Sequence, residues 1–251
     1  MTSVGVVIPW YQKGPDPWRE RALAHVRAWW DTAFPGRVVL GTISSDDGPW
    51  RKGLAVHRGI AELDAEIVVV SDADVICEGV DDAIAQISRF DVGWAIPHRM
   101  VCRLTADATT MLLQDNTYPP TPTRTGVTGP HYAEVYPGAP GGGLVVLPRR
   151  LLEDVPIDPR FCGWGQEDYA WARALTMIAG HPWRGRFPLF HLFHEPQQRM
   201  SRGIGSSDSH RLWQRYHTAP NLPVMLDLIE EARKALHTTT EKTLSDPLAT
   251  I

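Results

Sequence analysis

Short apolar runs and longer amphipathic segments alternate along the first hundred residues of the chain. This alternation, at this spacing, is typical of right-handed βαβ units with a mostly parallel sheet flanked by helices. The sequence therefore predicts an α/β fold. The apolar runs predict strands at residues 3–9, 37–43, 67–72 and 92–96, and the amphipathic segments predict helices at residues 18–32, 49–63 and 80–90.

The pattern changes after residue 97. Residues 98–138 are rich in Thr, Pro and Gly and show little periodicity, so we expect a long loop that lines a substrate cleft, or else a surface insertion. We expect one domain with halves at residues 1–97 and 98–237, and a flexible tail at 238–251. Later elements are predicted as a strand at 144–148, helices at 149–154 and up to 178, an extended segment at 187–194 and a closing helix at 222–236.

The third strand leads into two carboxylates. Ile67 to Val70 is a continuous apolar run, typical of a strand buried on both faces, and Asp72 and Asp74 follow it. On an extended backbone these residues point to the same side, at the strand end where open α/β sheets bind ligands. Two adjacent carboxylates need a positive partner, and a divalent cation supplies one. The alternative is a pair of solvated loop or helix-capping aspartates.

Composition narrows the classes of partner and compartment. The chain has 251 residues, a formal net charge of -4 and a pI of about 6.2, so no global basic bias recruits nucleic acid or an anionic membrane. We see no signal-peptide pattern and no apolar run of membrane-spanning length. Three irregularly spaced cysteines favour reduced thiols and a cytoplasmic protein over a disulfide framework.

Three later segments carry further candidate chemistry. Gly141, Gly142 and Gly143 precede a strand and permit close approach of a ligand or a neighbouring element. The sequence Gly-Trp-Gly-Gln-Glu-Asp at residues 163–168 opens a helix, whose N-terminus favours an ionised carboxylate; helix capping is the alternative interpretation. His191 and His194 lie in an apolar segment, where core histidines are the alternative to metal ligands.

Taken in this order, these motifs resemble nucleotide-sugar glycosyltransferases of the GT-A fold. The similarity covers about residues 3–194 and is greatest to the galactosyltransferase and chondroitin-polymerase type and to the polypeptide N-acetylgalactosaminyltransferase catalytic domain. The segment from Lys52 to Gly59 is also similar to the Asn-Lys-x-x-Ala-x-Asn-x-Gly helix of family 2 enzymes, with His57 in place of the second Asn. The resemblance implies a single GT-A domain with a nucleotide-sugar-binding half followed by an acceptor and catalytic half that contains a small mixed subregion.

The resemblance also implies roles for individual residues. Asp168 matches the general base of inverting members, and Glu167 would bind sugar hydroxyls. Asp74, assisted by Asp72, would bind Mn²⁺ or Mg²⁺ together with His194 or the competing His191. The segment at 197–209 would close over the donor as a lid. Contacts with the UDP-sugar are implied for Pro9, Trp10, Asp46, Asp47, Lys52, Asp72, Gly142, Gly143 and Trp164.

Three alternatives remain open from the sequence. One is a retaining glycosyltransferase of the polypeptide-modifying type, whose motif lacks a residue matching Asp168. The second is a nucleotidyltransferase, although residues 9–14 do not resemble its triphosphate-binding loop. The third is a sugar-binding domain without catalysis. Neither the donor sugar nor the acceptor, which could be a glycan, a protein, a small molecule or a modified nucleobase, is indicated by the sequence.

Overall fold

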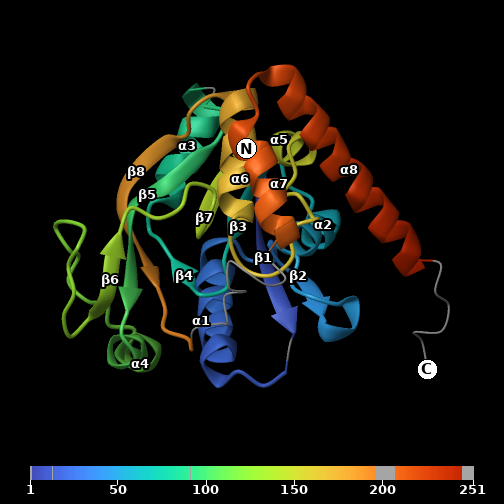
Figure 1. The fold of residues 1–251 in the computed structure, drawn as a ribbon. Helices are drawn as coiled ribbons and strands as arrows, with labels where there is room; N and C mark the ends of the chain where they lie inside the picture. Colours follow the sequence, from blue (N-terminus) through green and yellow to red (C-terminus); the bar gives the residue numbers. More distant parts are fainter. Residues whose placement is uncertain (1, 13, 91, 196–206, 245–251) are drawn as a thin grey trace.

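A mixed eight-stranded sheet forms the centre of the computed structural model, which describes residues 2–12, 14–90, 92–195 and 207–244 (Figure 1). The strand order is β2-β1-β3-β7-β5-β8-β4, and β6 pairs with β5. Pairings place β2, β1, β3, β5 and β8 in one direction, while β7, β6 and β4 run opposite. The strands are β1 (Val4–Gln12), β2 (Val38–Ser44), β3 (Ile67–Ser71), β4 (Val75–Ile76), β5 (Ala95–Leu104), β6 (Tyr132–Tyr136), β7 (Leu144–Pro148) and β8 (Trp183–His191).

Helices cover both faces of the sheet. Side chains of α1, α3 and α4 pack in one hydrophobic core, and those of α2, α5, α6, α7 and α8 pack in the other. The α/β class with a mostly parallel, helix-flanked sheet is therefore confirmed. The helices are α1 (Pro17–Ala33), α2 (Lys52–Ala61), α3 (Val80–Phe90), α4 (Ala106–Asp115), α5 (Arg149–Asp154), α6 (Glu167–Ala179), α7 (Ser207–Thr218) and α8 (Leu222–Leu244), with a 3-10 turn η1 (Ser45–Asp47).

The central strand β3 is buried on both faces, as its sequence predicts. Ile67 and Val69 belong to the core under α1, whereas Val68 and Val70 belong to the core on the opposite side. This alternation follows from the two-residue period of a strand. The chain leaves β3 at Asp72, whose side chain is partly exposed, and then returns to the core under α1 with Ala73, Val75 and Ile76.

The region after residue 97 is more regular than its composition predicts. The prediction of a loop at 98–138 is wrong in part, because β5 continues to Leu104 and is followed by α4 and β6. The extended segment expected at 187–194 begins four residues earlier, as β8. The helix α7 was not predicted, and α8 continues through Leu244 instead of fraying from Thr238. The expected lid at 197–209 falls largely on residues 196–206, which lie outside the described residues.

Cys77 and Cys102 are buried free thiols, and Cys162 is a partly exposed one. Among the described residues, no helix has both the length and the apolar content that a membrane crossing requires.

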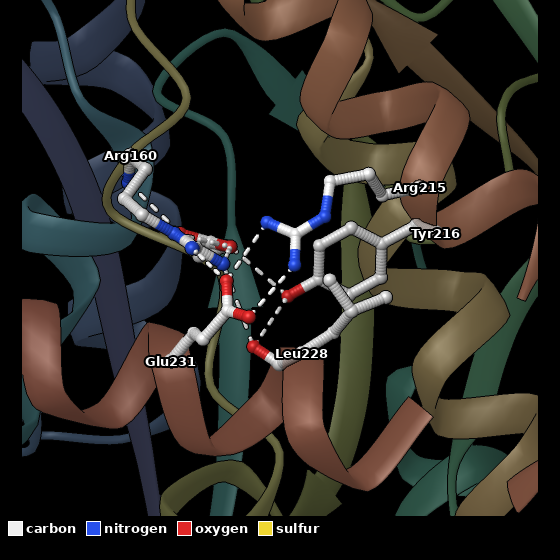
Figure 2. A network of polar contacts seen from close by, with 6 residues as sticks. Arg160, Arg215, Tyr216, Leu228 and Glu231 are labelled. Carbon is white, nitrogen blue, oxygen red and sulfur yellow. Dashed lines mark hydrogen bonds and ion pairs between the residues drawn. The ribbon is translucent and has the colours of Figure 1, made fainter. Parts of the chain in front are cut away.

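A partly buried ion-pair network centred on Asp158 fastens the loop before α6 to α7 and α8 (Figure 2). The guanidinium of Arg160 donates to both carboxylate oxygens of Asp158 and to Glu231. Arg215 donates to Glu231 at 2.7 and 2.8 Å, and the Tyr216 hydroxyl donates to Asp158 at 3.0 Å. Because Asp158 is buried, its charge depends on these partners. The network therefore fixes the segment that leads into residues 163–168.

We predict that Asp158→Ala destabilises the fold by about 3–5 kcal/mol, because it removes the buried carboxylate that pairs with Arg160 and accepts from the Tyr216 hydroxyl. Urea denaturation followed by circular dichroism measures this change in the free energy of unfolding. Glu230→Ala, which removes a surface ion pair on α8, is the matched control and is expected to cost less than about 1 kcal/mol. Equal losses for the two variants would contradict the assignment.

Candidate active site

A short strand ladder brings the two predicted histidines to Asp74. The two-residue strand β4 pairs antiparallel with the end of β8, with Val75 opposite His191, and the Leu192 amide donates to the Asp74 carbonyl at 2.8 Å. This pairing closes a separation of about 120 residues in the sequence. As a result, the Asp74 carboxylate lies 3.2 Å from Nε2 of His194 and 3.8 Å from Nε2 of His191.

Asp74, His191 and His194 together form a candidate metal group. One ligand atom from each lies within 4.8 Å of the other two. Burial alone would raise the pKa of Asp74, but the two imidazoles, together with Arg19, hold it well below its usual range. The Asp74 carboxyl group is therefore ionised. One carboxylate and two neutral imidazoles suit a divalent transition ion such as Mn²⁺ better than Mg²⁺, which prefers oxygen ligands throughout. Both histidines fit this group.

Asp72 does not join this group, which corrects the expectation that both aspartates point to one cation. The strand ends at Ser71 and a turn follows, so the alternation of side chains along a strand no longer applies. The Asp72 carboxylate instead accepts from the Gly143 amide at 3.1 Å and pairs with Lys52 at 2.8 Å. The Asp72 amide in turn donates to the Gly143 carbonyl.

Lys52 joins the end of β3 to the start of α6. Its ammonium lies 2.8 Å from Asp72 and 2.9 Å from Oδ1 of Asp168, and only 5% of the residue is exposed. Burial opposes the charge, but the carboxylates of Asp168, Asp72 and Glu167 outweigh it and raise the pKa of Lys52. The lysine is therefore a permanent cation that keeps two carboxylates side by side. Lys52 was expected to contact the donor. In the structure it contacts acidic residues of the protein instead.

Glu167 and Asp168 occupy the first turn of α6 and differ in environment. Glu167 is buried, its Oε2 has no hydrogen-bond partner among the described residues, and burial together with the Asp168 charge raises its pKa to about 8. Burial also raises the pKa of Asp168, but the ion pair with Lys52 opposes that rise. At neutral pH Glu167 is therefore a carboxylic acid that can donate a hydrogen bond, whereas Asp168 accepts one from Lys52.

The three glycines make room for Asp168. A Cβ on Gly142 would lie 2.7 Å from Oδ2 of Asp168, and one on Gly141 would lie 2.4 Å from the Asp168 carbonyl oxygen. Gly141 and Gly143 have φ values of +83° and +72°, which side chains rarely adopt. The close approach that the glycines permit is therefore to a neighbouring element in this structure, one of the two alternatives that the sequence left open.

The predicted Trp164 belongs to an aromatic cluster at the end of β1. Pro9 is buried inside this strand, which continues to Gln12 instead of ending at the proline. Trp50 stacks on Trp164 with ring centroids 6.0 Å apart, and Tyr11 contacts both rings.

A guanidinium that the sequence did not indicate lies between two of the tryptophans. The Arg19 guanidinium carbon is 5.6 Å from the centre of the Trp10 ring and 5.4 Å from that of Trp164. Nothing in a helix-initiating Asp-Pro-Trp-Arg sequence distinguishes this arginine from a surface residue, because its neighbours come from β1 and from the loop before α6.

Asp46 and Asp47, predicted as alternative contacts to the nucleoside, are not equivalent. Asp47 receives two hydrogen bonds from Arg58, at 2.8 and 2.9 Å, and two more from the amide and hydroxyl of Ser44. The Arg58 guanidinium lowers its pKa to about 2. Asp47 therefore has a structural role, and the exposed Asp46 remains the candidate. His57, at the position of the family asparagine, lines a separate cavity of about 330 Å³ between α2, α5 and α8.

Comparisons with known proteins gave similarities only among solved structures; no family model and no curated protein matches the sequence. Glucosyl-3-phosphoglycerate synthase from Mycobacterium tuberculosis, in complex with Mn²⁺, UDP and glucosyl-3-phosphoglycerate, is 13% identical with a TM-score of 0.43, over 87% of this chain and 79% of that chain. A complex of the same enzyme with Mg²⁺ and UDP has a TM-score of 0.42 at the same identity and coverage. These are similarities of backbone at low identity, so activity is inferred below from the residues of this chain.

We predict that Asp74→Asn and His194→Ala each weaken Mn²⁺ binding by more than about 100-fold. Loss of a direct ligand should exceed the 10- to 100-fold typical of residues that only orient ligands. Electron paramagnetic resonance of free Mn²⁺ measures the affinity. Asp72→Asn is the control, because its carboxylate faces Lys52 and Gly143, and we expect its affinity for Mn²⁺ to match the wild type. A loss in Asp72→Asn as large as in Asp74→Asn would contradict this geometry.

We also predict that kcat/KM for donor turnover falls as pH rises through about 8. The raised pKa means that Glu167 is protonated below that pH; above it, a second negative charge appears beside Asp168 and repels an anionic substrate. Glu167→Gln keeps a neutral hydrogen-bonding group at every pH, so this variant should lack the alkaline limb. A pH profile of kcat/KM for both proteins gives the answer. Identical alkaline limbs would assign the titration to another group.

Proposed function

We propose that the protein is a metal-dependent glycosyltransferase that moves a hexose or N-acetylhexosamine from a UDP-sugar to an acceptor hydroxyl. One observation carries the proposal: two differently built acidic groups meet at the carboxyl end of β3, separated by a single residue. Asp74 with His191 and His194 offers a cation site, and Asp72 with Lys52 leads to Asp168. Ligands of open α/β sheets bind at this end of the strands.

The candidate metal group is suited to a diphosphate leaving group. A bound divalent ion neutralises the charge that builds on phosphate oxygens as the bond to the sugar breaks, without a proton transfer. Asp74, His191 and His194 would hold that ion from one side, so that its remaining positions face the substrate. The aromatic faces of Trp164 and Tyr11 lie on elements that border the same end of the sheet and would contact the nucleoside or the sugar.

Asp168 supports an inverting mechanism. Its Oδ1 is held by Lys52, whereas Oδ2 makes no hydrogen bond within the described part of the chain and lies beside Gly142. Oδ2 would accept the proton of the acceptor hydroxyl as the hydroxyl oxygen bonds to C1 of the sugar and the bond from C1 to the diphosphate breaks. Lys52 remains paired with Asp72 when Asp168 becomes neutral, so no buried charge is left alone. Glu167 would donate to a sugar hydroxyl.

Two finer points belong to the same proposal. An attack from the face opposite the diphosphate inverts the anomeric centre, so the product of an α-linked donor should be β-linked; an α-linked product would support the retaining alternative.

The three free thiols fit a reducing compartment, and we propose the cytoplasm as the site of action.

We predict that purified protein releases UDP from one or a few UDP-sugars only when Mn²⁺ is present. A coupled assay for UDP over a panel of UDP-sugars, with and without chelator, tests this directly. Release that is equal with and without chelator would contradict the metal assignment. Binding of UDP-sugar with no turnover under any acceptor would support a non-catalytic binding domain.

On the donor that this panel identifies, Asp168→Asn should lower kcat by about 10²- to 10⁴-fold, the usual contribution of a general base. UDP affinity should stay near that of the wild type, since Oδ2 serves the acceptor. The matched control is Asp107→Asn, which neutralises an exposed carboxylate in the first turn of α4. A wild-type kcat in Asp168→Asn would remove this residue from the mechanism.

A further inference from the structure

The Arg19 guanidinium lies over two indole rings from distant parts of the chain. Trp10 is on β1 and Trp164 is in the loop before α6, and the guanidinium carbon lies within 5.6 Å of both ring centres. Planar stacking on aromatic faces is characteristic of arginine and uses only the two flat faces of the guanidinium. The edge of the group, which carries its N–H donors, is left available.

Those donors have no acceptor within the described ranges of the chain. The only hydrogen bond given for Arg19 there is from its backbone amide to Asp16, and its guanidinium takes part in no ion pair. Arg27, two turns later on the same helix, instead reaches Asp31 at 3.7 Å. A half-buried guanidinium that is oriented but unpaired presents a fork of donors suited to the oxygens of a carboxylate or phosphate.

The position of Arg19 selects between those anions. The neighbouring Trp18 packs edge-to-face against Phe193 with ring centroids 5.0 Å apart, so the first turn of α1 lies next to His194, and the charge of Arg19 acts on both Asp74 and His194. Asp74 itself is already engaged by the two imidazoles. A diphosphate held by a divalent ion at that group would bring phosphate oxygens, with net negative charge left over, to the side where the guanidinium edge is free.

We propose that Arg19 binds the diphosphate of the nucleotide donor, with Trp10 and Trp164 holding its guanidinium in the plane of the phosphate oxygens. This inference rests on the proposed function and adds a residue that the motifs did not include. It makes Arg19 a binding residue for the diphosphate and not for the nucleoside. Donor binding would then contact the loop that leads into Glu167 and Asp168, because Trp164 belongs to that loop.

The experiment compares UDP with uridine by isothermal titration in the presence of Mn²⁺. Variants are Arg19→Gln, Arg19→Lys and the control Arg27→Gln, which removes an exposed guanidinium from the same helix. Loss of a charge-assisted contact should weaken UDP binding by about 10- to 100-fold in Arg19→Gln. Uridine and Mn²⁺ affinities should stay within about threefold, because neither involves the guanidinium edge. Arg19→Lys keeps the positive charge but lacks the forked guanidinium, so its UDP affinity should lie between those of the wild type and Arg19→Gln.

The outcomes separate this inference from the proposed function. Wild-type protein that binds UDP with Mn²⁺, together with an Arg19→Gln variant of unchanged UDP affinity, overturns the role of Arg19 alone. Equal losses of uridine and UDP would show that Arg19 only shapes the aromatic site, and would also overturn it. Wild-type protein that binds neither UDP nor Mn²⁺ overturns the proposed function and this inference with it. Circular dichroism of each variant confirms that the fold is intact.

Discussion

The buried ammonium of Lys52 is the interaction on which the site depends. It is the first residue of α2, and it pairs with Asp72 at the end of β3 and with Asp168 at the start of α6. Without this cation the two carboxylates would repel each other across a partly desolvated space, and at least one would take up a proton. With it, Asp168 can remain ionised beside a protonated Glu167. The ion pair between Lys52 and Asp168 therefore stabilises the structure and also holds the proposed catalytic base.

A second constraint supplies the cation site. The two-residue strand β4 is short, but its pairing with β8 brings His191 and His194 to Asp74, and the Leu192 amide locks the register. The turn between Ser71 and Val75 separates the two aspartates and directs one to each group. The same few residues thus serve a metal group on one side and a lysine-carboxylate group on the other, which is the arrangement that a reaction combining a diphosphate leaving group with proton removal requires.

The alternating strands and helices of the first 97 residues could be predicted because each buried strand is an apolar run and each helix has an apolar stripe. The second half could not be predicted as well. Strand β5 includes the buried His98 and the exposed Arg99, and α7 buries little beyond Leu212 and Tyr216 at a spacing of four residues, so neither shows a continuous pattern. Tertiary packing, not local preference, decides both elements.

The candidate site was predictable in its residue types more than in its contacts. Asp74, Asp168 and the two histidines could be selected by motif and order, and the structure brings them to the same end of the sheet. The partner of each carboxylate depended on where β3 stops, which is a difference of one residue from the predicted end. The pairing of Asp47 with Arg58 and the stacking of Arg19 between two tryptophans depend on contacts between separate elements, for which one sequence carries no signal.

The central claim is that a divalent cation binds between Asp74, His191 and His194, with Asp168 at the same end of the sheet. A crystal structure of the protein soaked with Mn²⁺ and UDP, with anomalous data collected at a wavelength where manganese scatters strongly, tests it most directly. The account predicts one strong anomalous peak within about 2.0–2.4 Å of the Asp74 carboxylate and of at least one imidazole nitrogen, with UDP phosphate oxygens completing its coordination. A peak bound to Asp72 instead, or UDP bound away from these residues, would contradict it.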